Sequence, residues 1–122
     1  MTKISNKTKA YDLEERTFQF ARSIRLFVKT LPNNLANLED GKQLIKASGS
    51  VGANYIEANE ALSKKDFLMR IRISRKEAKE SAYWLKLINE TNKLQNADEA
   101  TALTQEANEL KNILSSILNK CR

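Results

Sequence analysis

The chain has 122 residues, of which 21 are Lys or Arg and 15 are Asp or Glu, with no His and a single Cys. This length fits one domain, and a hydrophobic content of 41% with 30% charged residues is typical of a globular protein. The absence of His excludes Ser-His and Cys-His catalysis, the usual zinc sites and the di-iron motif of helical bundles. Three Gly and one Pro are too few for the turns of an all-β fold. We therefore expect a helical protein without enzymatic activity and without a cofactor.

The net charge of +6 favours a partner with an acidic surface, nucleic acid before anionic lipid. No apolar run approaches the ~18 residues of a membrane span, and residues 1–10 lack the apolar core of a secretory signal. Cys121 has no second cysteine with which to form an intramolecular disulfide. These features predict a cytoplasmic protein with no membrane partner.

The first ten residues are polar, and their charges are three lysines without an acid, at Lys3, Lys7 and Lys9. We expect residues 1–10 to form a mobile basic tail. After it, alternating steps of four and three residues predict a first helix whose buried face comprises Leu13, Thr17, Phe20, Ile24, Phe27 and Leu31. Pro32, with the two asparagines that follow it, should end this helix.

A second helix should follow, with Asn37 as its N-cap. Its predicted buried face comprises Leu44, Ser48, Val51, Tyr55, Ala58 and Leu62. The segment Ser48-Gly-Ser-Val-Gly resembles a phosphate-binding loop, but it lacks the G-x-x-x-x-G-K-[ST] pattern and a preceding strand. We interpret its small residues as allowing close approach of a neighbouring helix, at ~1 kcal/mol per Gly in helix propensity.

Ser63, followed three residues later by Asp66, predicts the start of a third helix. Its expected buried face comprises Phe67, Ile71, Ser74, Ala78, Ser81, Leu85 and Ile88. Asn96 should begin a fourth helix, whose expected buried face comprises Ala100, Leu103, Ala107, Leu110, Leu114, Ile117 and Cys121. Short links between long helices predict an all-α, antiparallel up-down-up-down four-helix bundle over residues 11–122, in a single domain.

The excess positive charge is concentrated in two places, the tail with the first helix and the third helix, residues 64–86. A helical wheel gathers five basic residues of the third helix on one side, namely Lys65, Lys76, Lys79, Lys86 and Arg72. Arg75 borders this group and Tyr83 lies within it. Four of the five are spaced by seven residues, as a surface that follows a phosphate backbone would require. A merely solvated helix face is the alternative interpretation.

The same wheel, with Ile71 as its origin, places four apolar residues nearly opposite the buried face: Met69, Ile73, Trp84 and Leu87. On the first helix, Phe18 is predicted to lie opposite the buried face, among Arg22, Arg25 and Lys29. Because a monomer would leave these apolar residues in water, we predict that they form contacts between subunits of a homo-oligomer.

Other groups have weaker chemical signals. The carboxylate pairs Glu57/Glu60 and Glu77/Glu80 each share a helix face, but without His they are no metal motif. A structural pairing between Asn54 or Glu57 and Arg75 is more plausible. The aromatic residues that could stack on bases are Tyr55, Tyr83 and Trp84, although packing is the more common role at helical spacing. Cys121 lacks an activating neighbour in the sequence.

The segment from Ser48 to Ala61 (SGSVGANYIEANEA), followed by Asp66-Phe67 and Arg75-Lys-Glu-Ala-Lys-Glu-Ser, resembles the bacterial four-helix-bundle proteins known as ribosomal-RNA intervening-sequence proteins. Glu80 matches an acidic position that this family favours. The resemblance implies a homopentameric barrel with a basic surface. The related accessory proteins of diversity-generating retroelements are associated with reverse transcriptase and RNA. No catalytic residue is implied.

The sequence therefore predicts a self-assembling bundle that binds nucleic acid, RNA more than DNA, through its phosphate backbone. The main contacts are expected from Lys65, Arg72, Lys76, Lys79 and Lys86, with Arg22, Arg25, Arg75 and the basic tail assisting. The alternative is an oligomeric adaptor that recruits another protein, such as a nucleic-acid enzyme. A third reading, a hydrolytic or metal enzyme, would depend on Glu57 or Glu80.

Overall fold

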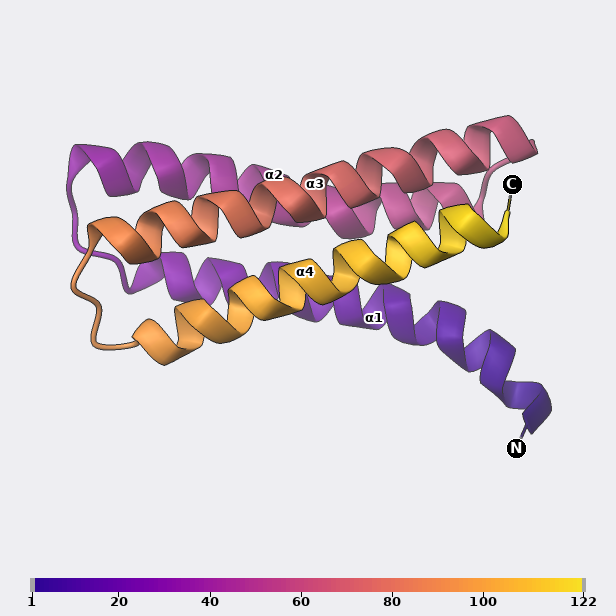
Figure 1. The fold of residues 1–122 in the computed structure, drawn as a ribbon, viewed down its shortest axis with the longest axis horizontal. Helices are drawn as coiled ribbons and strands as arrows, with labels where there is room; N and C mark the ends of the chain where they lie inside the picture. Colours follow the sequence, from indigo (N-terminus) through magenta and orange to yellow (C-terminus); the bar gives the residue numbers. More distant parts are fainter. Residues whose placement is uncertain (1, 122) are drawn as a thin grey trace.

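The computed structural model describes residues 2–121, with side chains from Asp12 to Cys121. It contains four helices, α1 (Thr2–Lys29), α2 (Leu35–Asn59), α3 (Lys64–Thr91) and α4 (Ala97–Lys120), and no strand within the described residues. Consecutive helices run side by side in opposite directions, and α1 also packs on α4 (Figure 1). The predicted all-α fold is therefore confirmed.

The buried faces follow the predicted spacing closely, because alternating steps of three and four residues keep side chains on one side of each helix. The fully buried core combines Ile24 and Phe27 of α1 with Leu44 of α2, Ile71 of α3 and Leu110 of α4. Five residues near helix ends were wrongly predicted to be buried. Leu31, Phe67 and Cys121 are half-buried. Leu62 lies beyond the end of α2 and is fully exposed, and Leu118 takes the buried place predicted for Ile117, which is half-buried.

The helix starts are set by asparagine and serine, as expected, but one cap was misplaced. The side chain of Asn34 caps α2 by accepting a 2.8 Å hydrogen bond from the Asn37 backbone N–H. Asn37 is therefore not the N-cap, but lies in the first turn. Ser63 caps α3 by accepting from the Asp66 N–H at 3.1 Å, as predicted. Asn96 occupies the N-cap position of α4, but its side chain binds Thr30 instead of the helix backbone.

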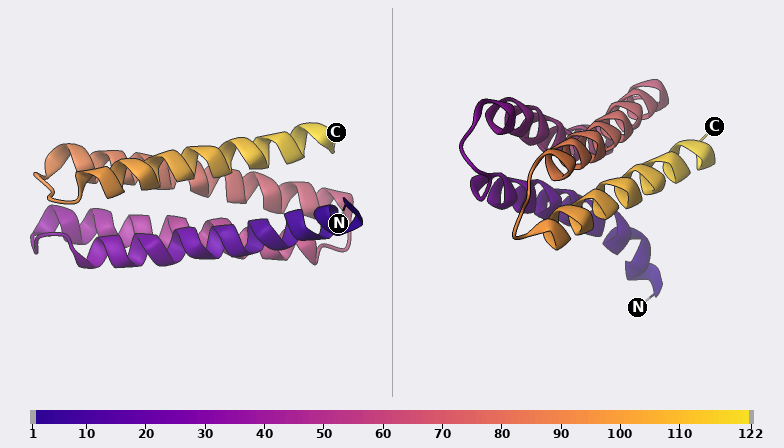
Figure 2. Two further views of the ribbon diagram at one scale, coloured as in Figure 1. Left: turned by 90° about the horizontal axis from the view of Figure 1, so that it is seen from below. Right: turned by 60° about the vertical axis from the view of Figure 1, so that its left-hand side comes forward.

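Residues 2–10 extend α1 in the structure, so the helix begins earlier than its apolar pattern indicates. Toward this end α1 diverges from the other three helices (Figure 2). The side chains of Lys3, Lys7 and Lys9 lie outside the described side chains. The mobility of this basic segment stays a prediction.

The small residues of α2 bring α1 close, which confirms the packing interpretation of residues 48–52. A Cβ atom added to Gly52 would lie 2.9 Å from Thr17 Oγ1 and 3.1 Å from Thr17 Cβ. The same atom on Gly49 would lie 3.0 Å from an Arg25 guanidinium nitrogen. Residues 48–52 are continuous helix in the structure, so they do not form a phosphate-binding loop.

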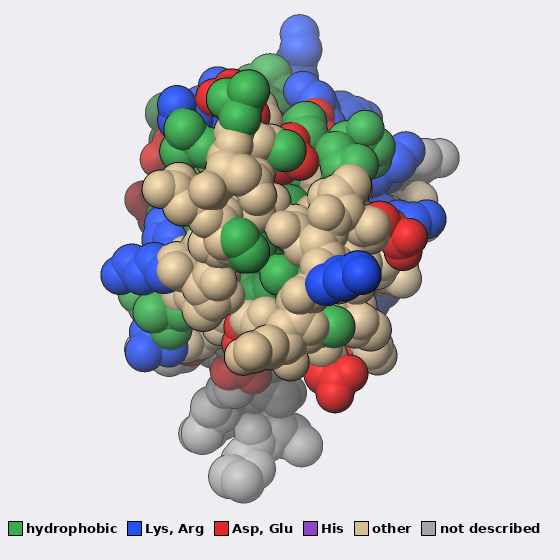
Figure 3. Space-filling view, turned by 90° about the vertical axis from the view of Figure 1, so that its left-hand side faces the viewer, with side chains coloured by type: hydrophobic (Ala, Val, Ile, Leu, Met, Phe, Trp, Pro, Cys, Tyr) green, Lys and Arg blue, Asp and Glu red, His purple; other side chains and the backbone are tan. Residues whose placement is uncertain are grey.

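Asparagines join the helices at the end that carries the α1–α2 and α3–α4 loops. The amide nitrogen of Asn37 donates to Asn92 Oδ1 at 2.9 Å and to the Pro32 carbonyl at 2.9 Å, and Asn92 returns a 2.8 Å bond to Asn37 Oδ1. Backbone and uncharged polar side chains cover most of this end, with hydrophobic side chains between them, and most charged side chains stand toward its edge (Figure 3). The sequence pattern did not indicate this reciprocal amide pair.

Candidate nucleic-acid interface

The outer side of α3 carries the predicted basic surface. We call Lys65, Arg72, Lys76, Lys79 and Lys86 together the cationic face, and all five are exposed. The buried residues of α3 run from Ile71 to Ile88 and centre about 50° from Ile71 on a wheel with 100° per residue. Measured from this corrected centre, the five residues of the cationic face lie about 110–170° around the helix, on the side away from the core. From Lys65 to Lys86 it extends roughly 32 Å at 1.5 Å per residue.

The charges of this face are largely uncompensated. Lys76 Nζ lies 4.0 Å from a Glu80 carboxylate oxygen, an exposed pair one helical turn apart. The other four basic side chains have no ion pair within 4.0 Å among the side chains that the structure describes. Such charges attract an anionic polymer, because binding releases the counterions condensed on its phosphates.

The remaining predicted phosphate contacts are divided between different surfaces. Arg75 is half-buried at the border of the cationic face. Arg22 and Arg25 are exposed on α1, which contacts α2 and α4 but not α3 within the described residues. Arg25 also donates to the backbone carbonyls of Ala21 and Ile45, at 3.0 and 3.4 Å. The structure thus does not bring the arginines of α1 onto the cationic face.

The predicted apolar strip of α3 is less exposed than the sequence indicated. Met69 is 46% exposed, but Ile73, Trp84 and Leu87 are half-buried, and Trp84 packs against the core of its own chain. The wheel was centred on Ile71, at one edge of the buried face, and so it rotated this strip too far from the core. Phe18, on α1, is 61% exposed as expected. The role of these residues between subunits, and the number of subunits, stay predictions.

The expected pairing of α2 with Arg75 was wrong, because another arginine makes the contact. Arg70 donates to the side-chain oxygen of Asn54 at 3.2 Å, while Glu57 is exposed. Nearby, the Ser74 hydroxyl donates to the Val51 carbonyl at 2.6 Å within the core. These two contacts fix the register of α3 against α2.

The carboxylate pairs offer little chemistry. Glu57 and Glu60 are exposed, whereas Glu77 and Glu80 line a polar groove with Lys46 and Ser50 between α2 and α3. Burial raises the pKa of the Glu77 carboxyl above its usual value, and the neighbouring Glu80 carboxylate adds to the shift. The described residues contain no group of three or more His, Cys, Asp or Glu side chains suited to a metal ion.

The three aromatic candidates occupy different environments. Tyr55 is 5% exposed, and burial raises the pKa of its phenol above the usual value. Trp84 is half-buried against the core. Tyr83 is 60% exposed and meets the Trp84 ring edge-on, with centroids 5.1 Å apart and an interplanar angle of 79°. Of the three, Tyr83 is therefore the ring that presents the most surface to a ligand.

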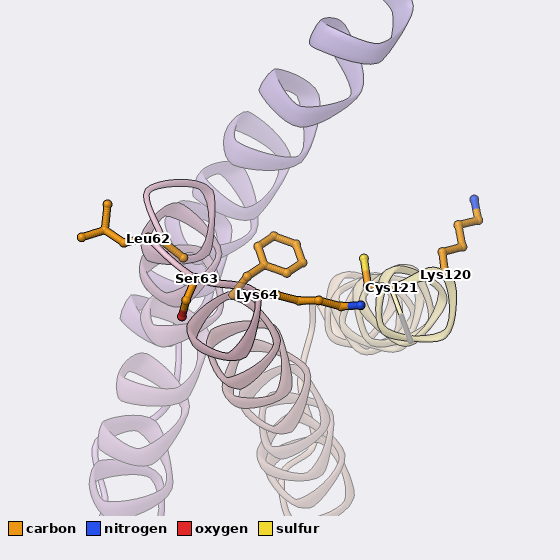
Figure 4. A pocket seen from close by; sticks show the side chains of 7 residues that line it. Leu62, Ser63, Lys64, Lys120 and Cys121 are labelled. Atoms are coloured by element: carbon orange, nitrogen blue, oxygen red, sulfur yellow. The ribbon is translucent and has the colours of Figure 1, made fainter.

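A shallow hollow of about 600 Å³ lies beside the start of α3. It is lined by Leu62 and Ser63 from the α2–α3 link, by Lys64 at the start of α3, and by Lys120 and Cys121 from the end of α4 (Figure 4). Cys121 is half-buried and forms no disulfide. Lys64 adds a further cation next to Lys65, at one end of the cationic face.

Comparison with known proteins places the chain in a family. Residues 9–116 match the model of the 23S rRNA-intervening sequence protein family. The fold is similar to the crystal structure of a protein with unknown function from the S23 ribosomal protein family of Bacteroides thetaiotaomicron VPI-5482. That comparison has a TM-score of 0.81 at 30% identity and covers 91% of this chain and 98% of the other. No curated protein sequence matches the chain.

None of the helices, within the described residues, is both long and apolar enough to cross a membrane. The family match spans nearly all of the bundle, including every residue of the cationic face. The chain therefore belongs to the 23S rRNA-intervening sequence protein family.

Proposed function

We propose that this protein is a non-enzymatic nucleic-acid-binding bundle whose cationic face contacts the phosphate backbone. The observation that carries this proposal is the row of exposed basic side chains on the side of α3 that faces away from the core. Among the side chains that the structure describes, this row makes a single ion pair, the weak contact between Lys76 and Glu80. The family name, which refers to an intervening sequence of 23S rRNA, supports RNA as the preferred polymer.

The number of basic residues sets the expected salt dependence. If four or five of them each neutralise one phosphate, the slope of log affinity against log salt concentration is about −3 for a single strand and about −4 for a duplex. The base edges are not read by any recognised motif in this chain, so the proposed binding depends little on sequence.

Charge reversal on the cationic face tests the proposal. The variant Arg72→Glu/Lys79→Glu should bind a mixed-sequence RNA at least ten-fold more weakly at about 0.1 M salt. Its plot of log affinity against log salt concentration should also be shallower, by about 1.5 in slope. The matched control is Lys42→Glu/Lys93→Glu, which changes the net charge equally at two exposed lysines outside the cationic face. Equal losses in both variants would indicate attraction by net charge alone and would contradict a defined face.

We further propose that the protein associates with itself through exposed apolar residues. Of the five residues predicted to contact another subunit, Phe18 and Met69 are the most exposed. The other three, Ile73, Trp84 and Leu87, lie on α3 with Met69. Light scattering of Phe18→Ala/Met69→Ala should then give a smaller mass than the original chain at equal concentration. The alternative, an oligomeric adaptor, predicts instead that a partner protein is captured in a salt-insensitive manner and that Arg72→Glu/Lys79→Glu leaves this capture unchanged.

A further inference from the structure

Tyr83 lies inside the cationic face of α3. On α3 it lies four residues after Lys79 and three before Lys86, so both are its direct neighbours on the helix surface, with Cβ atoms about 5–6 Å apart. Its side chain remains 60% exposed. An aromatic ring is thus presented to solvent with a phosphate-binding cation on each side.

The ring of Tyr83 also packs against a residue that contacts the core. It meets Trp84 edge-on at 5.1 Å, and Trp84 is itself packed against the core. Edge-to-face contacts of this kind stabilise a ring beyond the burial of its area, because the positive edge of one ring meets the negative face of the other. The contact restrains Tyr83 without covering most of its surface, which lowers the entropy that a ligand must remove when it binds.

We propose that the cationic face binds single-stranded nucleic acid, with an unpaired base stacked on Tyr83 and its flanking phosphates held by Lys79 and Lys86. This inference rests on the proposed function and names the form of nucleic acid that the same face selects. A duplex keeps its bases stacked inside, so it offers the tyrosine only its backbone. A single strand exposes the faces of its bases, which stack on aromatic side chains whatever their sequence.

The test compares Tyr83→Ala with Tyr83→Phe, which keeps the ring and removes the hydroxyl. The probes are a 12-nucleotide oligouridylate and a 12-base-pair RNA duplex, titrated across a salt series. Tyr83→Ala should bind the oligouridylate about ten-fold more weakly with an unchanged salt slope, and should bind the duplex within two-fold of the original chain. Tyr83→Phe should match the original chain on both probes.

Two controls separate stacking from damage to the fold. Leu35→Ala removes an exposed apolar side chain outside the cationic face and should leave affinity for the oligouridylate unchanged. Trp84 is the only tryptophan of the chain, so its fluorescence reports on the neighbouring ring. The oligouridylate should change this fluorescence in the original chain and in Tyr83→Phe, and the duplex should not.

The outcomes distinguish the two proposals. If Tyr83→Ala binds the oligouridylate as tightly as the original chain while Arg72→Glu/Lys79→Glu does not, backbone binding stands and stacking is wrong. Equal weakening on both probes, or a loss in Tyr83→Phe as large as in Tyr83→Ala, would also overturn stacking. Failure of the original chain to bind either probe would refute the proposed function itself.

Discussion

Helix α1 contacts its two neighbours, α2 and α4, in different ways. It lies so close to α2 that a Cβ atom added to Gly52 would come within 2.9 Å of Thr17 Oγ1. Long charged side chains join it to α4. Arg16 donates two 2.7 Å bonds to the Glu106 carboxylate and one 2.9 Å bond to Glu109. These hydrogen bonds, that to Glu106 above all, raise the pKa of the Arg16 guanidinium above its usual value.

The difference lies in the size of the residues at the two interfaces. Where glycine removes the side chain, the helix backbones approach and dispersion contacts hold them. Helix α1 diverges from α4 toward its N-terminus (Figure 2). A partly exposed ion pair between Arg16 and Glu106 joins the two helices. We therefore expect the α1–α2 interface to tolerate salt but not added volume, and the α1–α4 interface to tolerate volume but respond to salt.

The largest expected effect is from Gly52→Ala. The added methyl group meets the buried Thr17, which cannot move away, so unfolding free energy should fall by about 1–3 kcal/mol despite the gain in helix propensity. Gly49→Ala is the matched control, because its methyl group meets the far end of the flexible Arg25 side chain. That variant should be neutral or more stable. Urea denaturation of both at one protein concentration makes the comparison, and equal losses would contradict it.

A smaller effect is expected at the other interface. Arg16→Ala removes a partly exposed bidentate pair, so the loss should be about 1 kcal/mol at low salt. In 1 M salt, where screening acts over about 3 Å, the difference from the original chain should shrink. A loss that stays constant from low to high salt would mean that packing of the Arg16 stem, and not charge, joins α1 to α4.

The smallest effect concerns the groove between α2 and α3. Burial raises the pKa of the Glu77 carboxyl in the folded protein. Above that pKa the ionised carboxylate lowers the free energy of unfolding, because it is more stable in the unfolded chain. This loss of stability fades as the pH falls toward the ordinary glutamate pKa of about 4.3. Glu77→Gln should therefore melt slightly higher than the original chain at pH 7, and the difference should vanish near pH 4. A lower melting temperature at pH 7 would show that the carboxylate is stabilised by Lys46 or Lys76.

Much of the fold was predictable because helical periodicity is a local property. The spacing from Leu13 to Phe27 and the Ser63 cap could be read directly, and both are confirmed. The Asn34 cap was missed because two adjacent asparagines and Asn37 all satisfy the composition rule, and only the backbone geometry distinguishes them. The first ten residues carry no apolar stripe from which the start of α1 could be read.

The cationic face was also predictable, since its residues share one helix. What the sequence could not give is the orientation of that helix against its neighbours. Trp84 was placed opposite the core, although it packs partly against it, because the angle was measured from Ile71 instead of from the centre of the buried face. The contact between Arg70 and Asn54 likewise depends on the register of two helices, which no single-helix pattern contains.

The reciprocal amides of Asn37 and Asn92 also determine which misfolded arrangements the chain rejects. An interior rich in leucine, isoleucine and alanine accepts α2 displaced by one turn along α3 at modest cost, since such side chains substitute for one another. A displacement of about 5.4 Å would separate the two amides and leave each without its partner, at about 1–3 kcal/mol for each stranded group. Together with the Arg70–Asn54 and Ser74–Val51 contacts, this amide pair thus favours a single alignment of α2 along α3.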